Sequence, residues 1–260
     1  MRLPRLTPYV LAALACGRQL HGATAAFELE STRPLAMSLT RPQSDTWPPS
    51  RGACMQWQIS HDIPFGLPDL AGHRFVIAHR RRPVALRFGL SIRGPSRHRE
   101  IAMSAGGDAR LPSGSITSVA LTRYHIDQDA VGSRRGWGMS LALEMALRTG
   151  LSVIVAGRGA ADPFVERRLE LQVVRRWGSD GSATVTLEKD ASRSHRLRTM
   201  AVRQIDARLR LQMGTSSGPR QFAAGAAARA GGTQLQYLIR THAHLGPTHA
   251  VALGHDGECL

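Results

Sequence analysis

The feature that most constrains the fold of this chain is a strict alternation over residues 137–147. Every second residue there is large and apolar, and the residues between are small or charged. The large apolar residues are Trp137, Met139, Leu141, Leu143, Met145 and Leu147. Successive side chains of a strand point to opposite faces, so this pattern predicts a strand with one unbroken apolar face. A helix over residues 137–148 is the alternative, because Met, Leu, Ala, Glu and Arg are strong helix formers.

The first 25 residues carry the pattern of a secretion signal. Arg2 and Arg5 precede an apolar run over residues 9–16, and residues 23–25 supply small side chains for cleavage. The run is shorter than the roughly 20 apolar residues that a membrane-spanning helix needs. We therefore predict that the chain is exported, with residues 1–25 as signal peptide. Lipidation at Cys16, which would anchor the chain to a membrane, is the alternative.

The exported part divides by composition into a leader and a larger domain. Residues 26–54 are rich in Pro and Ser, which predicts an extended segment without helix. Residues 55–260 are predicted to form a single β-domain. Cys54 and Cys259 lie near the two ends of the exported chain, in a compartment that permits disulfides. A disulfide between them is one prediction, and two unpaired thiols are the other.

Further alternating segments recur along the domain at a spacing of roughly 10 to 20 residues, joined by turns that contain Gly. They occupy residues 55–59, 73–79, 84–93, 116–126, 151–155, 168–177, 183–189, 197–213 with a break, 234–241 and 248–253. Residues 148–150 predict a hairpin turn with Gly150 in the left-handed position. Serial short strands joined in this way predict an all-β fold, an antiparallel meander closing into a β-barrel. A soluble β-sandwich is the alternative.

The alternation at residues 137–147 is long enough to cross an outer membrane. Eleven residues at a rise of about 3.3 Å, tilted by about 45°, cover the roughly 25 Å apolar band of such a membrane. Trp137 and Trp177 would then lie at opposite interfaces. In this respect the chain resembles the outer-membrane β-barrels of Gram-negative bacteria. Segments as short as residues 183–189, and an aromatic content of 5%, favour instead a soluble periplasmic or surface domain.

The charge of the chain is strongly positive, with 34 basic against 19 acidic residues. Such a surface attracts polyanions. Export argues against nucleic acid as the partner. The expected partners are therefore lipopolysaccharide or other outer-membrane lipid, and anionic solutes or acidic polysaccharide.

The alternation assigns the charged residues of the barrel to its lumen. Leu86, Phe88, Leu90 and Ile92, then Leu169, Leu171 and Val173, then Leu209 and Leu211 would face lipid. The opposite face then presents Arg87, Arg93, Arg176, Arg208 and Arg210, together with Glu144 and Glu170. A lumen lined by guanidinium groups attracts anions, which predicts a pore for anionic solutes or acidic polysaccharide. A plugged structural barrel whose Arg and Glu side chains pair with one another is the alternative.

A second resemblance depends on the helical alternative. Residues 157–163, with Gly157, Gly159 and Pro163, followed by residues 166–171, resemble the end of the peptidoglycan-binding domain of outer membrane protein A. Residues 129–132 are similar to the Asp-x-x-Gly turn of that family. The resemblance covers about residues 84–176 and implies an α+β domain in which Asp129 binds peptidoglycan. The ligand-binding Arg of the family falls on Leu143 here.

Catalytic chemistry is not indicated by the sequence. Residues 214–218 match the pattern Gly-x-Ser-x-Gly, but no helix is expected after them as that motif requires, and the pair Gly157 and Gly159 lacks the third Gly of a phosphate loop. His242, His244, His249 and His255 gather near the C-terminus, but their spacing alone does not define a metal site. We expect no enzyme activity, no cofactor and no metal.

Overall fold

The chain folds into a single closed sheet of β-strands. The computed structural model describes residues 53–258, apart from short gaps at 82, 96–97, 129–131, 161–166, 178–180, 191–194, 218–219 and 243–244. The strands of the first half are β1 (Ala53–Ile63), β2 (Gly72–Arg81), β3 (Val84–Arg93), β4 (His98–Arg110), β5 (Ile116–Gln128), β6 (Gly132–Arg148) and β7 (Leu151–Ala160). Those of the second half are β8 (Arg168–Trp177), β9 (Gly181–Asp190), β10 (Arg196–Gln204), β11 (Leu209–Ser217), β12 (Arg220–Ala230), β13 (Thr233–His242) and β14 (Thr248–Glu258).

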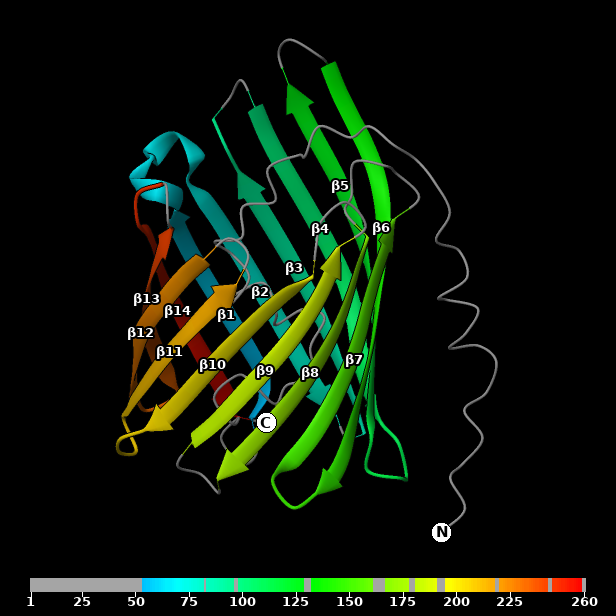
Figure 1. Ribbon diagram of the computed structural model, residues 1–260. Coiled ribbons are helices and arrows are strands. Elements are labelled where there is room, and N and C mark those ends of the chain that lie inside the picture. The colour runs from blue at the N-terminus through cyan, green and yellow to red at the C-terminus, as the bar shows by residue number, and fades with distance from the viewer. Residues whose placement is uncertain are drawn as a thin grey trace.

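Each strand pairs antiparallel with the next along the chain, and β14 pairs with β1 to close a barrel (Figure 1). At the closing seam Trp57 is opposite His255, and Asp62 is opposite Ala250. Closure satisfies the backbone N–H and C=O groups of every strand without leaving an edge. The prediction of an antiparallel meander that closes into a barrel is confirmed, and the β-sandwich alternative is wrong.

The barrel exposes apolar side chains on its outer face and buries polar side chains on its inner face, which is the reverse of a soluble protein. Along β3, Leu86, Phe88 and Leu90 are exposed on the outside of the barrel, whereas Arg87 between them is only 5% exposed. Along β6, Trp137, Met139 and Leu141 face outward, and Ser140 and Ala142 are buried on the inside. The period of two therefore separates an apolar outer face from a small or polar inner face.

The apolar outer face continues around the barrel as a band. Exposed large apolar side chains outside those two strands include Phe75, Val119, Leu169, Leu171, Val173, Val185, Leu187, Leu211, Met213, Leu235, Val251 and Leu253. A contiguous apolar surface of this kind is far larger than water-soluble monomers expose. It matches the lipid-facing band of a transmembrane barrel. In the described part of the chain, no helix is both long and apolar enough to cross a membrane.

The two ends of the barrel differ. Short turns connect the strands at the end where β1 begins and β14 ends; two residues, for example, separate β6 from β7. At the other end β1 and β2 are joined by a longer connection that contains the 3-10 helices η2 (Pro64–Gly66) and η3 (Pro68–Leu70), in cyan in Figure 1. We call these the turn end and the loop end. Trp137 lies near the loop end of β6 and Trp177 at the turn end of β8.

The helical alternative for residues 137–148 is wrong, because these residues lie in β6, the longest strand. The α+β domain expected over about residues 84–176 is also wrong, since the described residues of this range form β3 to β8 and the turns between them. Gly157 and Gly159 lie inside β7 rather than in a turn. Helix propensity is overridden here by the pairing of β6 with β5 and β7, which places its apolar stripe on the outer face.

Several strands are longer than the alternation alone indicates. The expected segment 183–189 lies within β9, which includes polar residues at both ends and reaches 10 residues. The interrupted segment 197–213 is two strands, β10 and β11, joined by a turn at residues 205–208. Two strands, β4 and β12, were not expected at all. The hairpin between β6 and β7 has Gly150 in the left-handed region, with φ of 74°, as predicted.

Candidate functional site

The arginines expected in the lumen divide into two groups. Arg87, Arg93 and Arg176 lie on the inner face of their strands, and Arg210 occupies an inner position of β11. Arg208 instead lies exposed in the turn between β10 and β11, where its backbone N–H donates to Oδ1 of Asp206 at 2.6 Å. Asp129, Cys16 and Cys259 lie outside the described residues, as does the side chain of Cys54.

Toward the turn end, the inner arginines bind acidic side chains of nearby strands. Arg87 on β3 donates to the carboxylate of Asp108 on β4, and both side chains are buried. Arg229 on β12 reaches Asp256 on β14, with 2.9 Å between Nη2 and Oδ2. Asp256 also accepts a hydrogen bond from Gln56 on β1. These contacts connect neighbouring strands and strands two apart on the inside of the wall.

Arg93 and Asp62 make a similar contact near the loop end. Nη2 of Arg93 on β3 lies 3.4 Å from Oδ2 of Asp62 on β1, so the pair spans the intervening strand β2. The residue of β2 beneath this contact is Gly72, where a Cβ atom would lie 2.6 Å from Oδ1 of Asp62. The absence of a side chain at position 72 therefore leaves room for the carboxylate beside the guanidinium.

Three arginines converge inside the loop end of the barrel. Arg74 on β2 is 8% exposed, and Arg158 on β7 and Arg93 on β3 lie close enough to repel it electrostatically, whereas Asp62 attracts it. Four strands lie between β2 and β7 in the wall of the barrel. The side chains of Arg74 and Arg158 therefore come near each other through the lumen and not along the wall. We call Arg74, Arg93 and Arg158 the arginine cluster.

Tyr124 orients the third member of this cluster. Arg158 donates a hydrogen bond to the hydroxyl of Tyr124 on β5, and its guanidinium carbon lies 5.4 Å from the centre of the ring. Between the two strands lies Gly138 of β6, where a Cβ would be 3.0 Å from Cε2 of Tyr124. A Gly again permits a contact between strands that are two apart.

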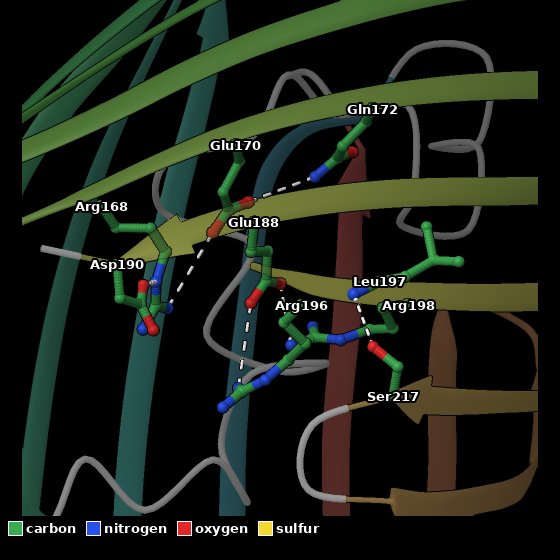
Figure 2. A network of polar contacts seen from close by, with 9 residues as sticks. All are labelled: Arg168, Glu170, Gln172, Glu188, Asp190, Arg196, Leu197, Arg198 and Ser217. Atoms are coloured by element: carbon green, nitrogen blue, oxygen red, sulfur yellow. Dashed lines mark hydrogen bonds and ion pairs between the residues drawn. The ribbon is translucent and has the colours of Figure 1, made fainter. Parts of the chain in front are cut away.

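A second charged network lines the wall formed by β8, β9 and β10 (Figure 2). Glu188 on β9 is 1% exposed, and its carboxylate lies 2.8 Å from Nη2 of Arg198 and 3.9 Å from Nη1 of Arg196. Arg168 on β8 pairs with Asp190 and with Glu170. Buried carboxylates of this kind remain charged only where cations and donors surround them.

A cavity that is open to solvent lies against strands β9 to β13. Its lining includes the polar side chains of Thr184, Thr186, Arg198, Gln212, Gln221 and Arg240. Met200 and Leu238 add apolar surface. A Thr hydroxyl and a Gln amide can each donate and accept hydrogen bonds, and Arg240 and Arg198 add guanidinium groups, the second of them paired with Glu188. Most of the surface that the lining exposes is apolar, and these polar groups interrupt it.

Two residues of the arginine cluster, Arg74 and Arg158, are not among the residues predicted from the sequence. Arg74 lies in an expected strand, and the alternation that places Phe75 on the outer face assigns Arg74 to the inner face. Arg158 lies in the segment 157–163, whose resemblance to a peptidoglycan-binding domain does not predict a strand. As for metals, the described residues contain no group of three or more His, Cys, Asp or Glu arranged to hold an ion. His249 bonds to the hydroxyl of Tyr237 at 2.7 Å, and His255 to that of Thr233 at 3.1 Å.

Comparison with known proteins relates this geometry to one fold. No family model matches the sequence, and no curated protein matches it. Among solved structures, the chain is similar to the CymD monoaromatic hydrocarbon channel, with a TM-score of 0.62 and 8% identity over 92% of this chain and 96% of that one. It is also similar to the Acinetobacter baumannii outer membrane protein Omp33, with a TM-score of 0.57 and 7% identity over 79% of this chain and 99% of that one.

The KdgM porin gives a TM-score of 0.49 and 10% identity over 78% of this chain and 99% of that one. At identities this low, the similarity to these structures shows the fold alone. The peptidoglycan-binding domain of outer membrane protein A has no support from the comparisons or from the barrel architecture. The chain has the closed, porin-like β-barrel fold of outer-membrane channel proteins.

Proposed function

We propose that this protein is a channel of the Gram-negative outer membrane that admits anionic solutes. The observation that carries the proposal is the convergence of Arg74, Arg93 and Arg158 inside the loop end of the barrel, with Asp62 as the acidic side chain beside Arg74. The proposal includes export through the signal at residues 1–25 and no catalytic role.

The electrostatics of a narrow lumen favour this function. Arg stays charged at any physiological pH and binds carboxylate or phosphate through two parallel hydrogen bonds. Walls of low dielectric constant focus the field of such charges, which raises the local concentration of anions and lowers that of cations. The acidic residues of the lumen reduce this effect, since Asp108, Glu144, Glu188 and Asp256 each contact an Arg. Inside the loop end of the barrel, the arginine cluster makes the electrostatic potential of the lumen positive.

We infer a more specific substrate class, acidic saccharides, from the polar side chains that interrupt the mostly apolar lining of the cavity. Thr184, Thr186, Gln212 and Gln221 offer hydrogen bonds that sugar hydroxyls can accept or donate. Arg240 and Arg198, the latter already 2.8 Å from the carboxylate of Glu188, place guanidinium groups at the same wall. A saccharide chain with repeated carboxylates would meet both kinds of partner along its length. A small inorganic anion would need only the arginines.

The test is an ion-selectivity measurement on the purified protein in a planar bilayer. Under a salt gradient the native channel is expected to show a reversal potential of the sign that anion permeation produces. Arg74→Gln combined with Arg158→Gln should move the reversal potential toward or past the nonselective value, because Arg93 is then the only cation of the cluster left beside Asp62 and Glu100, which is opposite Arg93. Arg203→Gln is the matched control, since Arg203 is exposed on the outer face of β10.

The same measurement separates a channel from a structural barrel. A folded barrel is recognised by faster migration of the unboiled protein on a detergent gel. A protein that shows this shift but passes no current, or passes cations in preference to anions, would contradict the proposed function. A non-conducting result would favour the alternative in which the inner arginines serve only to pair with Asp and Glu.

A further inference from the structure

The outer face of strands β4, β5 and β6 carries a basic patch near the loop end. β6 continues past the loop end of β7, because the last pair between them is Gly138 with Ala160, and residues 132–137 lie beyond it. The hairpin of β5 and β6 accordingly rises above the neighbouring strand β7 in Figure 1. Its outer face presents Arg123, His125 and Arg135, and Arg99 extends the patch on β4.

The strand register brings these side chains together. Arg123 is opposite Trp137, and His125 is opposite Arg135, so Arg123 and Arg135 are diagonal neighbours on one face. Diagonal neighbours lie within reach of long side chains, at about 7–8 Å between backbones. Arg99, Arg123 and Arg135 are all exposed. We call these three residues the outer basic patch.

Trp137 fixes the level of this patch relative to the apolar band. It is the loop-end member of the outward stripe on β6, and below it come Met139 and Leu141, which are exposed on the same face. Indole rings at the end of an apolar band lie at the level of lipid headgroups. The guanidinium of Arg123 lies over the Trp137 ring, 5.7 Å from its centre. The patch is therefore at or just above the headgroups and outside the lumen.

The charges of the patch are only partly balanced within the described part of these strands. On their outer face near the loop end Asp127 is the only acidic side chain described, and it is directly opposite Arg99. Its carboxylate accepts a hydrogen bond from Ser133 at 2.9 Å. No acidic residue is directly opposite Arg123 or Arg135, and Asp127 is a diagonal neighbour of Arg135. The three arginines therefore outnumber the one carboxylate on this face. Two arginines at diagonal positions, one of them over an aromatic ring, complement a phosphate on an amphipathic molecule.

We propose that the outer basic patch binds the phosphate groups of a phosphorylated glycolipid, lipopolysaccharide. Arg123 and Arg135 contact one phosphate between them, Arg99 extends the positive field, and Trp137 packs against the acyl and sugar boundary below. Longer connections mark the external end of an outer-membrane barrel, and the loop end carries the longest described connection, so the patch faces the outer leaflet. This placement rests on the outer-membrane location in the proposed function, whereas the binding itself does not depend on conductance.

The experiment measures binding of fluorescently labelled lipopolysaccharide to the full chain folded in detergent. The variant Arg123→Ala with Arg135→Ala should bind about ten-fold more weakly than the native protein, since a pair of charge-assisted contacts is lost. The matched control is Arg175→Ala with Arg203→Ala, two exposed outward arginines near the turn end. It should bind like the native protein. Binding should also fall steeply as salt approaches 1 M, where screening acts within about 3 Å.

Two competitors distinguish the source of the phosphate. Lipopolysaccharide from which the phosphates have been removed should compete poorly, and phosphatidylglycerol micelles should compete less well than intact lipopolysaccharide. Equal binding by the Arg123 and Arg135 variant, with its gel shift intact, would overturn the proposal. Equal competition by either control lipid would overturn it as well. A barrel that binds lipopolysaccharide in this manner yet passes no current would leave the proposal standing and contradict only the channel function.

Discussion

Arg176 on β8 reaches across β7 to Glu144 on β6, with 3.3 Å between Nη2 and Oε1. Its other terminal nitrogen donates to Oγ of Ser152 on β7 at 3.3 Å, so one side chain links three consecutive strands on the inside of the wall. The carboxylate of Glu144 is nearly buried, whereas Arg176 is 30% exposed. The buried carboxylate of Glu144 therefore needs this guanidinium to balance its charge, whereas water can solvate the guanidinium of Arg176 if the carboxylate is lost.

We expect Arg176→Gln to lower the free energy of unfolding by about 1–3 kcal/mol, because it leaves a buried carboxylate without its cation. Glu144→Gln should cost less, since Arg176 can still be hydrated. The double variant should lose less free energy of unfolding than the two single variants lose together. Urea titration of the protein in lipid vesicles measures all four forms. Strict additivity of the two effects would show that the contact carries no coupling energy.

Gly72 should be intolerant of even one added carbon. A Cβ at this position would lie 2.6 Å from Oδ1 of Asp62 and 3.2 Å from Nε of Arg93, so Gly72→Ala must displace that ion pair. We expect a loss of about 1–3 kcal/mol in urea titration. Gly159→Ala in β7 is the control, because a Cβ there meets nothing within 4 Å. Its effect should stay within about 0.5 kcal/mol. Equal effects would mean that Asp62 and Arg93 can move apart freely.

Leu171 tests whether the outer face contacts lipid. It is 44% exposed near the middle of β8, and Leu111 is 39% exposed in the turn between β4 and β5. Exposure is nearly equal, but only Leu171 lies in the apolar band. Leu171→Arg should cost about 2–4 kcal/mol of stability in vesicles, as expected for Arg near the bilayer midplane. Leu111→Arg should change little. A similar, small effect of both changes would show that the band around Leu171 is hydrated.

Asp206, in the turn between β10 and β11, makes the stability of the folded protein depend on pH. Its carboxylate accepts hydrogen bonds from the backbone N–H groups of Arg208 and Leu209, which lower the pKa of Asp206 in the folded protein. A lowered folded-state pKa stabilises the fold above the pKa of the unfolded chain, and this contribution disappears as pH falls through the lowered value. The stability of the native protein relative to Asp206→Ala should therefore decrease in acid.

Asp206→Asn separates this effect from general acid unfolding. The amide oxygen of Asn still accepts hydrogen bonds from the turn but does not titrate. The difference in unfolding midpoint between the Asn and Ala variants should therefore be the same at neutral and at acid pH. Unfolding midpoints in urea over a series of pH values provide the comparison. A native-minus-Ala difference that does not change with pH would contradict the assigned shift.

The strands that the sequence predicted are those in which large apolar residues alternate with small or polar ones. Residues 84–93 coincide with β3, because its outer Leu and Phe contrast with its inner Arg and Ser. The sequence did not predict β12, because its residues 223–228 are Ala and Gly on both faces. Apolar and polar side chains therefore do not alternate there. β4 has the same weakness over residues 104–107. These strands are defined by hydrogen bonds to neighbours that do carry the pattern.

The candidate site was predictable only as a list of inward positions. Alternation placed Arg87, Arg93 and Arg176 on the inner face, but their partners depend on register between strands. Asp62 is 31 residues from Arg93 in the sequence, and it reaches that residue only because Gly72 separates them in the sheet. The approach of Arg74 to Arg158 depends on the curvature of the closed barrel. No local pattern encodes either relationship.

The seam between β1 and β14 joins the two ends of the described chain and closes the barrel. Gln56 and Asp256 meet there across 200 positions of sequence, whereas every other pair of adjacent strands joins segments that follow each other directly along the chain. Forming the seam requires a far larger loss of chain entropy than forming any hairpin. Until it forms, two strand edges present open N–H and C=O groups, which hydrocarbon does not tolerate. Insertion into a bilayer and completion of the circle must therefore be coupled, or the open edges must be shielded by another protein meanwhile.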